Sequence, residues 1–220
     1  MIITVLSCDK NQDLWEPFHH CMEKYFPGHP EVVYFTESLK NPYYRTISVS
    51  HDLNNWTYGV RHFLSLLEDN YILLMIDDCF IRRPVDRKRF EFANILIRWQ
   101  QDVACLNFEK SWDEHDIPTE YEGWKLRPHG SEYEVSIMCG MWNKKKLMNV
   151  LTPISNPWDV EYNQNNCNYN YYINSGDYII DWGYRTFQPC NVVKGKWARE
   201  IIPFFETEGI QMDYSIRGFA

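Results

Sequence analysis

The sequence predicts an α/β fold in which a mostly parallel central sheet has helices on both faces. Short β-rich apolar runs alternate along the chain with segments whose apolar residues recur at helical spacing. This alternation is typical of βαβ units and therefore of parallel strands. Apolar residues make up 45% of the 220 residues, which is enough for a sizeable core and excludes a disordered chain.

The N-terminal part of the chain predicts three strands and one helix. Residues 2–7 form a short β-rich run and are expected to be the buried first strand. Residues 11–26 carry apolar residues at helical spacing and end at a Pro-Gly-His-Pro break, which predicts a helix. A second strand is expected at 31–36 and a weaker third strand at 46–50.

The alternation continues up to residue 108. Residues 54–69 place asparagines ahead of their apolar residues and predict the second helix. Residues 71–76 are the most apolar run and predict a buried fourth strand. A third helix is expected at 86–101, because Asp86 suits its N-cap, and a fifth strand at 102–108.

The second half of the chain is less regular, but no linker in it marks an independent domain. We therefore expect one domain over 1–220, with halves at 1–108 and 109–220. The elements expected in the second half are, in order, a loop at 109–134, a strand at 135–142, a short helix at 143–152 and late strands at 177–182 and 190–197.

Charge and cysteine usage limit the partners and the compartment. A net charge of −8 argues against nucleic acid or an anionic membrane as a general partner, because both need a basic face; a local basic patch stays open. The seven cysteines are an odd number without zinc-like spacing, and Cys8, Cys79 and Cys105 lie in or beside apolar strand-like runs, where thiols behave as small hydrophobes. This indicates a reducing compartment. No leader pattern and no run of about 20 apolar residues is present, so a cytoplasmic protein with at most peripheral membrane contact is expected.

The fourth predicted strand runs directly into two neighbouring aspartates, Asp77 and Asp78. Burying two such carboxylates without compensation is costly, so either they lie at a solvated strand end or a positive group lies between them. Sheets of this kind bind ligands beyond the carboxyl ends of their strands, which should bring Asp9 and Glu37 to the same edge. Their common placement predicts a ligand site there.

The order of these features resembles the GT-A class of glycosyltransferases, in particular small bacterial and viral enzymes of polysaccharide assembly. The segments that carry the resemblance are ITVLSCDKNQDLWEPF at 3–18, CGMWNKKKL at 139–147, NPWDVE at 156–161 and VVKGKW at 192–197. The resemblance implies a Rossmann-like GT-A fold, with a nucleotide-sugar-binding first half and a smaller, mixed acceptor-binding second half. It also implies transfer of a sugar from a nucleotide-diphosphate-sugar to a hydroxyl group of a glycan or glycolipid.

The same resemblance implies roles for individual residues. Asp78, supported by Asp77, would hold a divalent cation, Mn²⁺ or Mg²⁺, against the donor diphosphate. The motif reads Asp-Asp-Cys rather than Asp-X-Asp, and no histidine follows His129, which leaves a weakly bound or absent metal open. The remaining assignments are Ser7, Cys8, Asp9 and Thr36 for the nucleoside, Asp77 and Lys196 for the donor phosphates, and Trp142 and Trp158 for the acceptor.

An inverting transfer also needs a carboxylate that takes the proton from the acceptor hydroxyl. The NPWDVE segment supplies Asp159 and Glu161 beside Trp158. Because Pro157 suits a helix start and Asp159 then serves its first turn, we favour Glu161 as the base and keep Asp159 as the alternative.

Two other functions fit the same fold. A sugar nucleotidyltransferase should carry a Gly-rich, basic loop after its first strand, and the SCDKNQD segment lacks one. A non-catalytic carbohydrate-binding protein would need neither the paired acids nor the donor-edge residues. Both alternatives therefore rank below the glycosyltransferase.

Overall fold

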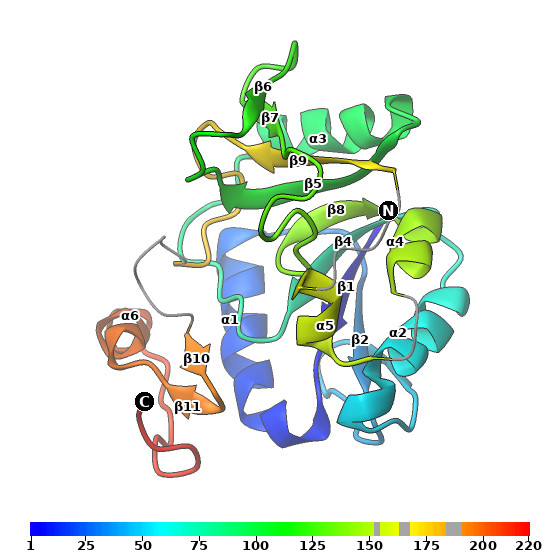
Figure 1. Ribbon diagram of the computed structural model, residues 1–220. Coiled ribbons are helices and arrows are strands. Elements are labelled where there is room, and N and C mark those ends of the chain that lie inside the picture. The colour runs from blue at the N-terminus through cyan, green and yellow to red at the C-terminus, as the bar shows by residue number, and fades with distance from the viewer. Residues whose placement is uncertain (152–154, 163–167, 184–190) are drawn as a thin grey trace.

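The computed structural model describes residues 1–151, 155–162, 168–183 and 191–220. A nine-stranded sheet in the order β3-β2-β1-β4-β8-β5-β9-β7-β6 forms its centre, and β10 and β11 form a separate hairpin (Figure 1). Seven of the nine strands run in one direction, and β7 and β8 run against them. The strands are β1 Ile2–Leu6, β2 Val32–Thr36, β3 Arg45–Ser48, β4 Tyr71–Ile76, β5 Val103–Lys110, β6 Ile117–Pro118, β7 Trp124–Leu126, β8 Gly140–Asn143, β9 Asn170–Asn174, β10 Val192–Val193 and β11 Lys196–Trp197.

Helices cover both faces of the sheet, as the sequence predicts (Figure 1). Alternate residues of β1 enter two separate cores, because successive strand side chains point to opposite faces. The helices α1 and α3 contribute to one core, and α2 and α4 contribute to the other. The helical elements are η1 Asp9–Leu14, α1 Trp15–Tyr25, η2 Leu53–Asn55, α2 Trp56–Ser65, α3 Arg87–Trp99, α4 Lys144–Val150, α5 Pro157–Tyr162, η3 Arg199–Ile201 and α6 Ile202–Glu208.

The parallel strands β1, β2 and β4 end at one edge of the sheet. The Ser7 amide donates to the Phe35 carbonyl at 3.1 Å, and the Asp77 amide donates to the Leu6 carbonyl at 3.3 Å. The residues that follow each strand therefore leave the sheet side by side. This is the geometry that the βαβ pattern predicts for the carboxyl ends of parallel strands.

The sequence pattern does not predict where the antiparallel strand β8 lies in the sheet. It comes from the second half of the chain and lies between β4 and β5. Gly140 permits the close approach, because a Cβ atom there would lie 3.0 Å from the Cys105 Sγ atom and 3.1 Å from the Leu106 carbonyl. The sheet thus continues across the expected boundary at residue 108, and the division into two halves stays a prediction.

Three expectations for the second half need correction. The expected loop at 109–134 contains β6 and β7, which pair with each other. Residues 177–182 form no strand, because the Ile179 and Asp181 carbonyls accept from the Asp86 and Arg82 amides in a loop contact. Residues 190–197 form a hairpin within the described part rather than one strand, and the positive φ angles of Lys194 and Gly195 turn it.

The C-terminal segment packs against α1 and the end of β4. The Glu208 carboxylate of α6 accepts from Lys24 Nζ at 2.6 Å and from Tyr25 OH at 2.7 Å. Phe205 packs on Phe80 with ring centroids 5.2 Å apart. These contacts hold α6 against the last turn of α1, and Arg217 then reaches Asp13 in η1.

No helix among the described residues is long and apolar enough to span a bilayer. The cysteines that lie in the described segments are free thiols, namely Cys8, Cys21, Cys79, Cys105 and Cys139.

Candidate active site

A cleft of about 830 Å³ opens at the carboxyl ends of β1, β2 and β4. Both halves of the chain line it. The first half supplies Asp9, Glu37, Asp77 and Asp78, so the four acids lie together as the strand order predicts. The second half contributes residues from α5, the β10–β11 hairpin and the C-terminal segment, among them Trp158, Glu161, Gly195 and Arg217.

Asp77 is buried at the floor of the cleft and is held by the first loop. Its Oδ2 atom accepts from Ser7 Oγ at 2.5 Å, and its Oδ1 atom accepts from Asn11 Nδ2 at 3.2 Å. Ser7 is oriented in turn by Trp15 Nε1, which donates to its hydroxyl at 2.8 Å. Burial, and then the charge of Asp78, raise the pKa of Asp77 to about 7 despite these donors.

Asp78 lies at the side of the cleft that the C-terminal segment closes. Burial raises its pKa to about 6, partly offset by a hydrogen bond from the Val192 backbone. Asn191 Nδ2 donates to the Asp78 carbonyl, which ties β10 to the end of β4. The two aspartates therefore form a buried acidic pair, and both ionise at a higher pH than an ordinary aspartate does.

The guanidinium of Arg217 places a positive charge near Asp77 and Asp78. Its Nε atom donates to Asp13 Oδ2 at 2.7 Å, and its Nη2 atom donates to Asn11 Oδ1 at 2.9 Å. Its charge lowers the pKa of both Asp77 and Asp78, although burial has the larger and opposite effect. Sequence reasoning missed Arg217, because the tail has no periodic pattern and only the packing of α6 places it here.

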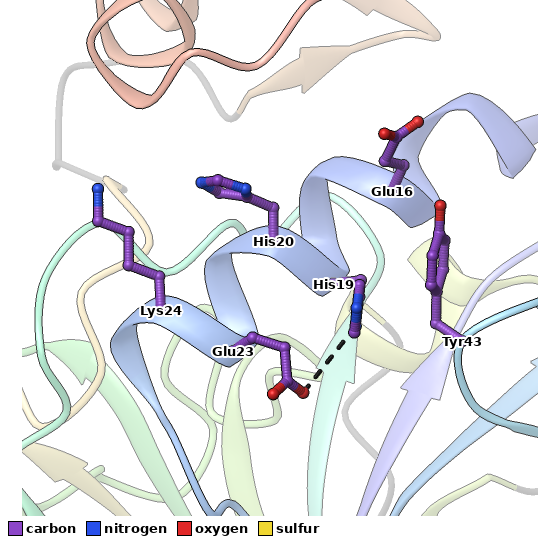
Figure 2. A pocket seen from close by; sticks show the side chains of 6 residues that line it. All are labelled: Glu16, His19, His20, Glu23, Lys24 and Tyr43. Carbon is purple, nitrogen blue, oxygen red and sulfur yellow. Dashed lines mark ion pairs between the residues drawn. The ribbon is translucent and has the colours of Figure 1, made fainter.

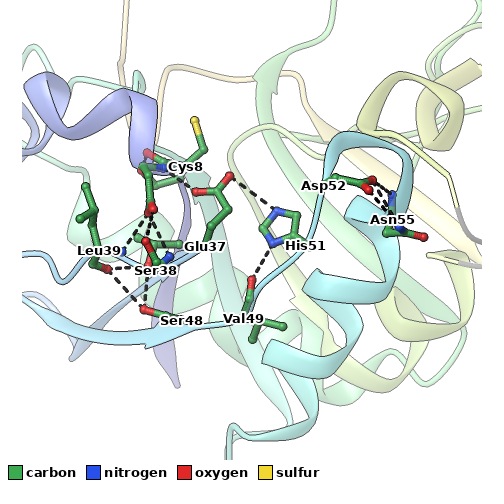
Figure 3. A network of polar contacts seen from close by, with 12 residues as sticks. Cys8, Glu37, Ser38, Leu39, Ser48, Val49, His51, Asp52 and Asn55 are labelled. Atoms are coloured by element: carbon green, nitrogen blue, oxygen red, sulfur yellow. Dashed lines mark hydrogen bonds and ion pairs between the residues drawn. The ribbon is translucent and has the colours of Figure 1, made fainter.

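The carboxyl ends of β1 and β2 are joined by a polar network (Figure 3). The Asp9 amide donates to Glu37 Oε2, and the Asp9 carboxylate accepts from the Ser38 and Leu39 amides at 3.1 and 3.0 Å. Burial opposes ionisation of Asp9, but hydrogen bonds from Ser38 and Leu39 outweigh it and lower the pKa. The Asp9 carboxylate thus organises the turn after β2.

His51 forms the wall of the cleft beside Glu37. Its Nδ1 atom donates to the Val49 carbonyl at 2.7 Å, and its ring stacks on Phe35 with centroids 4.7 Å apart. The other ring nitrogen, Nε2, lies 3.9 Å from Glu37 Oε1. Gly59 of α2 makes room for the ring, because a Cβ atom there would lie 2.8 Å from the His51 Cγ atom. The sequence shows no ligand-like spacing around His51, so its position in the cleft wall could not be predicted from the sequence.

Glu161 lies on the opposite side of the cleft, on α5. Burial raises its pKa to about 7, although the Ile137 amide donates to its Oε1 atom at 3.0 Å. Asp159 has a different task. Its amide donates to Asn156 Oδ1 at 3.0 Å, and its carboxylate accepts from the Asn156 amide at 3.4 Å, which is a capping box at the helix start. The expected helix start is confirmed, and Asp159 does not line the cleft as Glu161 does.

A second half-buried acid, Glu109, lies close enough to Glu161 to influence its ionisation. Glu109 accepts from Asn107 Nδ2 at 3.0 Å and from Ser136 Oγ at 3.2 Å. Burial raises the pKa of Glu109, and the charge of Glu109 in turn contributes to the raised pKa of Glu161.

Three predicted site residues lie elsewhere. Trp142 of β8 is fully buried and packs edge-on against Tyr171, so the expected acceptor contact is wrong. Thr36 is also fully buried, and its hydroxyl donates to the Leu39 carbonyl at 2.7 Å rather than facing the cleft. Lys196 is exposed on β11 and is not among the residues that line the cleft. Trp158 does line it and is 56% exposed.

Asp77 and Asp78 could hold a divalent cation whose other ligands come from elsewhere, but among the described residues they are not part of a preformed metal centre. Within the ranges that the structure describes, no group of three or more His, Cys, Asp or Glu side chains could hold a metal ion. Protein sites for Mg²⁺ commonly supply only one or two carboxylates and leave the other positions to phosphate oxygens and water. Asp77 and Asp78 supply that number, and their raised pKa values mean that an added positive charge is favourable.

A separate hollow of about 460 Å³ lies on the outer face of α1 (Figure 2). It is lined by Glu16, His19, His20, Glu23, Lys24 and Tyr43. Tyr43 stacks on His19 at 4.3 Å, and Lys24 pairs with Glu208. His19, Glu23 and Tyr43 contact one another or neighbouring elements, His20 and Lys24 face Glu208, and none of the six lines the acidic cleft.

The sequence matches no family model and no curated protein. Similarity to solved structures is found instead. CMP:2-keto-3-deoxy-manno-octonic acid synthetase in complex with CTP matches with a TM-score of 0.50 and 12% identity, over 80% of this chain and 89% of that one. At this identity the likeness shows the fold alone, and it confirms the predicted Rossmann-like α/β fold.

Two further similar structures belong to longer proteins. The bifunctional IspDF of Campylobacter jejuni matches with a TM-score of 0.44 and 13% identity, over 80% of this chain and 50% of that one. Residues 1–349 of TarS from S. aureus match with a TM-score of 0.46 and 11% identity, over 81% of this chain and 59% of that one. The chain thus spans half to three fifths of these two matched chains. A shared fold does not distinguish one reaction from another, so function has to be argued from the site.

Proposed function

We propose that the protein is a glycosyltransferase that moves a sugar from a nucleotide-diphosphate-sugar to a hydroxyl group of a glycan or glycolipid. The observation that carries the proposal is the cleft itself. A buried acidic pair, Asp77 and Asp78, lies at the end of β4, and a carboxyl group with a pKa of about 7, Glu161, lines the same cleft from α5. A group that binds a diphosphate through a cation and a group that accepts a proton are what the reaction needs.

The donor half of the cleft lies along β1, β2 and β4. Asp78, with Asp77 in support, would bind a Mn²⁺ or Mg²⁺ ion that arrives with the donor. When bound, that ion supplies charge neutralisation for the departing diphosphate. Arg217 lines the same cleft and would add a positive charge there, with its guanidinium oriented by Asp13 and Asn11. Ser7 and Asn11 fix the Asp77 carboxylate so that it does not rotate away.

The nucleoside would lie beyond the diphosphate, against the ends of β1 and β2. Ser7, Cys8 and Asp9 line this part, together with Glu37 and His51. Burial, followed by the charges of Asp77 and Glu37, raises the pKa of the Cys8 thiol to about 11, so Cys8 acts there as a neutral contact and not as a nucleophile.

Glu161 is the proposed base. With a pKa of about 7, roughly half of its carboxyl groups are ionised at neutral pH, which suits proton acceptance. The Ile137 amide fixes its orientation from the opposite loop. Trp158, three residues earlier on the same short helix, presents an exposed ring on which the apolar face of an acceptor sugar could pack.

The test is an assay of nucleotide-sugar turnover with Mn²⁺, over a panel of donors and with mono- and oligosaccharide acceptors. We expect release of a nucleoside diphosphate that depends on acceptor and is nearly abolished by Asp78→Ala, whereas the exposed control Asp213→Ala keeps full turnover. Release of pyrophosphate from a nucleoside triphosphate and a sugar would indicate a nucleotidyltransferase. Glycan binding without any turnover would indicate a carbohydrate-binding protein. Either result would overturn the proposal.

A further inference from the structure

The outward face of α3 carries an exposed apolar stripe. Phe92 is 43% exposed, Ile95 is 50% exposed and Trp99 is 78% exposed. Their spacing of three and four residues places them on one side of the helix. The other side of α3 packs towards β5 and β8 through buried residues such as Phe90 and Leu96. In Figure 1 the helix lies at the periphery of the molecule.

Cations border this stripe. The exposed charged residues of α3 are three cations and one acid, which gives a local charge of +2 in a chain of net charge −8: Arg87, Lys88, Glu91 and Arg98. At about 100° per residue, Lys88 falls within the stripe, Glu91 falls beside it, and Arg87 and Arg98 fall farther out on the side of Glu91. Arg98 is held over the Tyr71 ring at 4.8 Å, which keeps its charge at the border of the stripe.

We propose that this face of α3 docks the protein reversibly on a membrane surface that contains anionic lipids. A helix with exposed Trp and aliphatic side chains on one side and Lys or Arg beside them is suited to the lipid headgroup region. Each cation near an anionic surface strengthens binding by about fivefold. The chain's overall negative charge would be repelled by the same surface, which confines the contact to this face.

A second copy of the chain fits this face less well. Antiparallel pairing of two α3 helices would bring Arg98 of one copy towards Arg87 and Lys88 of the other, and parallel pairing would bring like residues together. Both arrangements oppose cations to cations. A stable protein interface also uses about 20–30 residues on each side, whereas the apolar stripe has three. Anionic headgroups complement the cations, and the apolar stripe needs only to enter the interfacial layer.

The experiment is co-sedimentation of the full chain with vesicles at low salt. We expect binding to vesicles of equimolar phosphatidylcholine and phosphatidylglycerol, and much weaker binding to pure phosphatidylcholine. The combined substitution Phe92→Ser, Ile95→Ser and Trp99→Ser should reduce binding at least about tenfold. Lys88→Glu should reduce it by about fivefold or more. The matched controls lie on the other face of the sheet. They are Leu66→Ser at the C-cap of α2, which removes an apolar side chain 52% exposed, and Lys145→Glu in α4.

All of these positions are exposed, so the variants should keep the thermal unfolding midpoint of the parent protein, and that measurement checks the fold. The proposal is overturned if the parent protein ignores anionic vesicles. It is also overturned if the triple variant binds them as well as the parent does, or if the controls lose binding equally. Self-association that the triple variant abolishes, without vesicle binding, would assign the stripe to a second copy and would equally overturn it.

Discussion

Glu161→Gln should remove the proposed base and at the same time make the protein more stable at alkaline pH. The side chain keeps its size and one oxygen, so the Ile137 amide can still donate to it. Loss of a general base typically costs about 10²–10⁴-fold in rate. We therefore expect turnover to fall by that range, with donor affinity nearly unchanged.

The gain in stability follows from the pKa. Burial is the main reason that the pKa of Glu161 is raised from 4.5 to about 7. A group whose folded-state pKa lies above its ordinary value favours the folded state while it is protonated, so its contribution is lost as pH rises from 4.5 through 7. The full difference corresponds to about 3 kcal/mol of unfolding free energy above pH 7, because one pKa unit is about 1.4 kcal/mol. The amide variant has no carboxylate to ionise and escapes this loss.

Two measurements check this prediction together. Denaturant unfolding at pH 5 and pH 8 should show a stability gain for Glu161→Gln at pH 8 that shrinks at pH 5. At saturating donor and Mn²⁺, which keep Asp77 and Asp78 ionised, the pH profile of turnover for the parent protein should fall below pH 7 with a slope of one. Asp159→Asn is the control, because it weakens a helix cap without touching the cleft. Full turnover in Glu161→Gln, or an equal stability change at both pH values, would refute the reasoning.

Three further changes test the walls of the cleft. Arg217→Met should weaken nucleoside diphosphate binding about tenfold or more in calorimetry, since a charge-assisted contact is worth about 1.5–3 kcal/mol, and unchanged affinity would contradict the role. Gly59→Ala should displace His51 and cost about 1–3 kcal/mol of unfolding free energy along with donor affinity, and a variant of parental stability and affinity would show that the ring is not held there. Glu109→Gln should lower the pKa of Glu161 and move the acid limb of the turnover profile to lower pH; an unmoved limb would mean that the two acids do not interact. The exposed controls are, respectively, Arg45→Met, Ser65→Ala and Glu91→Gln.

The parallel part of the fold could be predicted because its signals are local. The apolar run of β4 and the two aspartates that follow it lie within eight residues, and the rule that parallel strands end at one edge then brings in Asp9 and Glu37. The start of α5 was predictable for the same reason, since Asn156, Pro157 and Asp159 form a cap within four residues.

The rest depends on contacts between distant segments. Trp142 looks like a ligand-binding aromatic in sequence, but β8 inserts between β4 and β5 and buries it. Arg217 reaches the cleft because α6 is anchored to α1, a contact that spans 184 positions from Lys24 to Glu208. His51 becomes a wall residue through the space that Gly59 leaves. No periodicity or motif encodes these three placements.

The most direct test of the central claim is calorimetric binding of a nucleoside diphosphate to the parent protein and to Asp78→Asn, with Mn²⁺ and with a chelator. If the acid pair holds the diphosphate through a cation, Mn²⁺ strengthens binding to the parent protein, and Asp78→Asn loses most of that gain. With the chelator, Asp78→Asn should bind the nucleoside diphosphate as tightly as the parent protein or more tightly, because the variant has lost a negative charge beside an anionic ligand. No binding of any nucleoside diphosphate to the parent protein, or an equal response to Mn²⁺ in both proteins, would contradict the account.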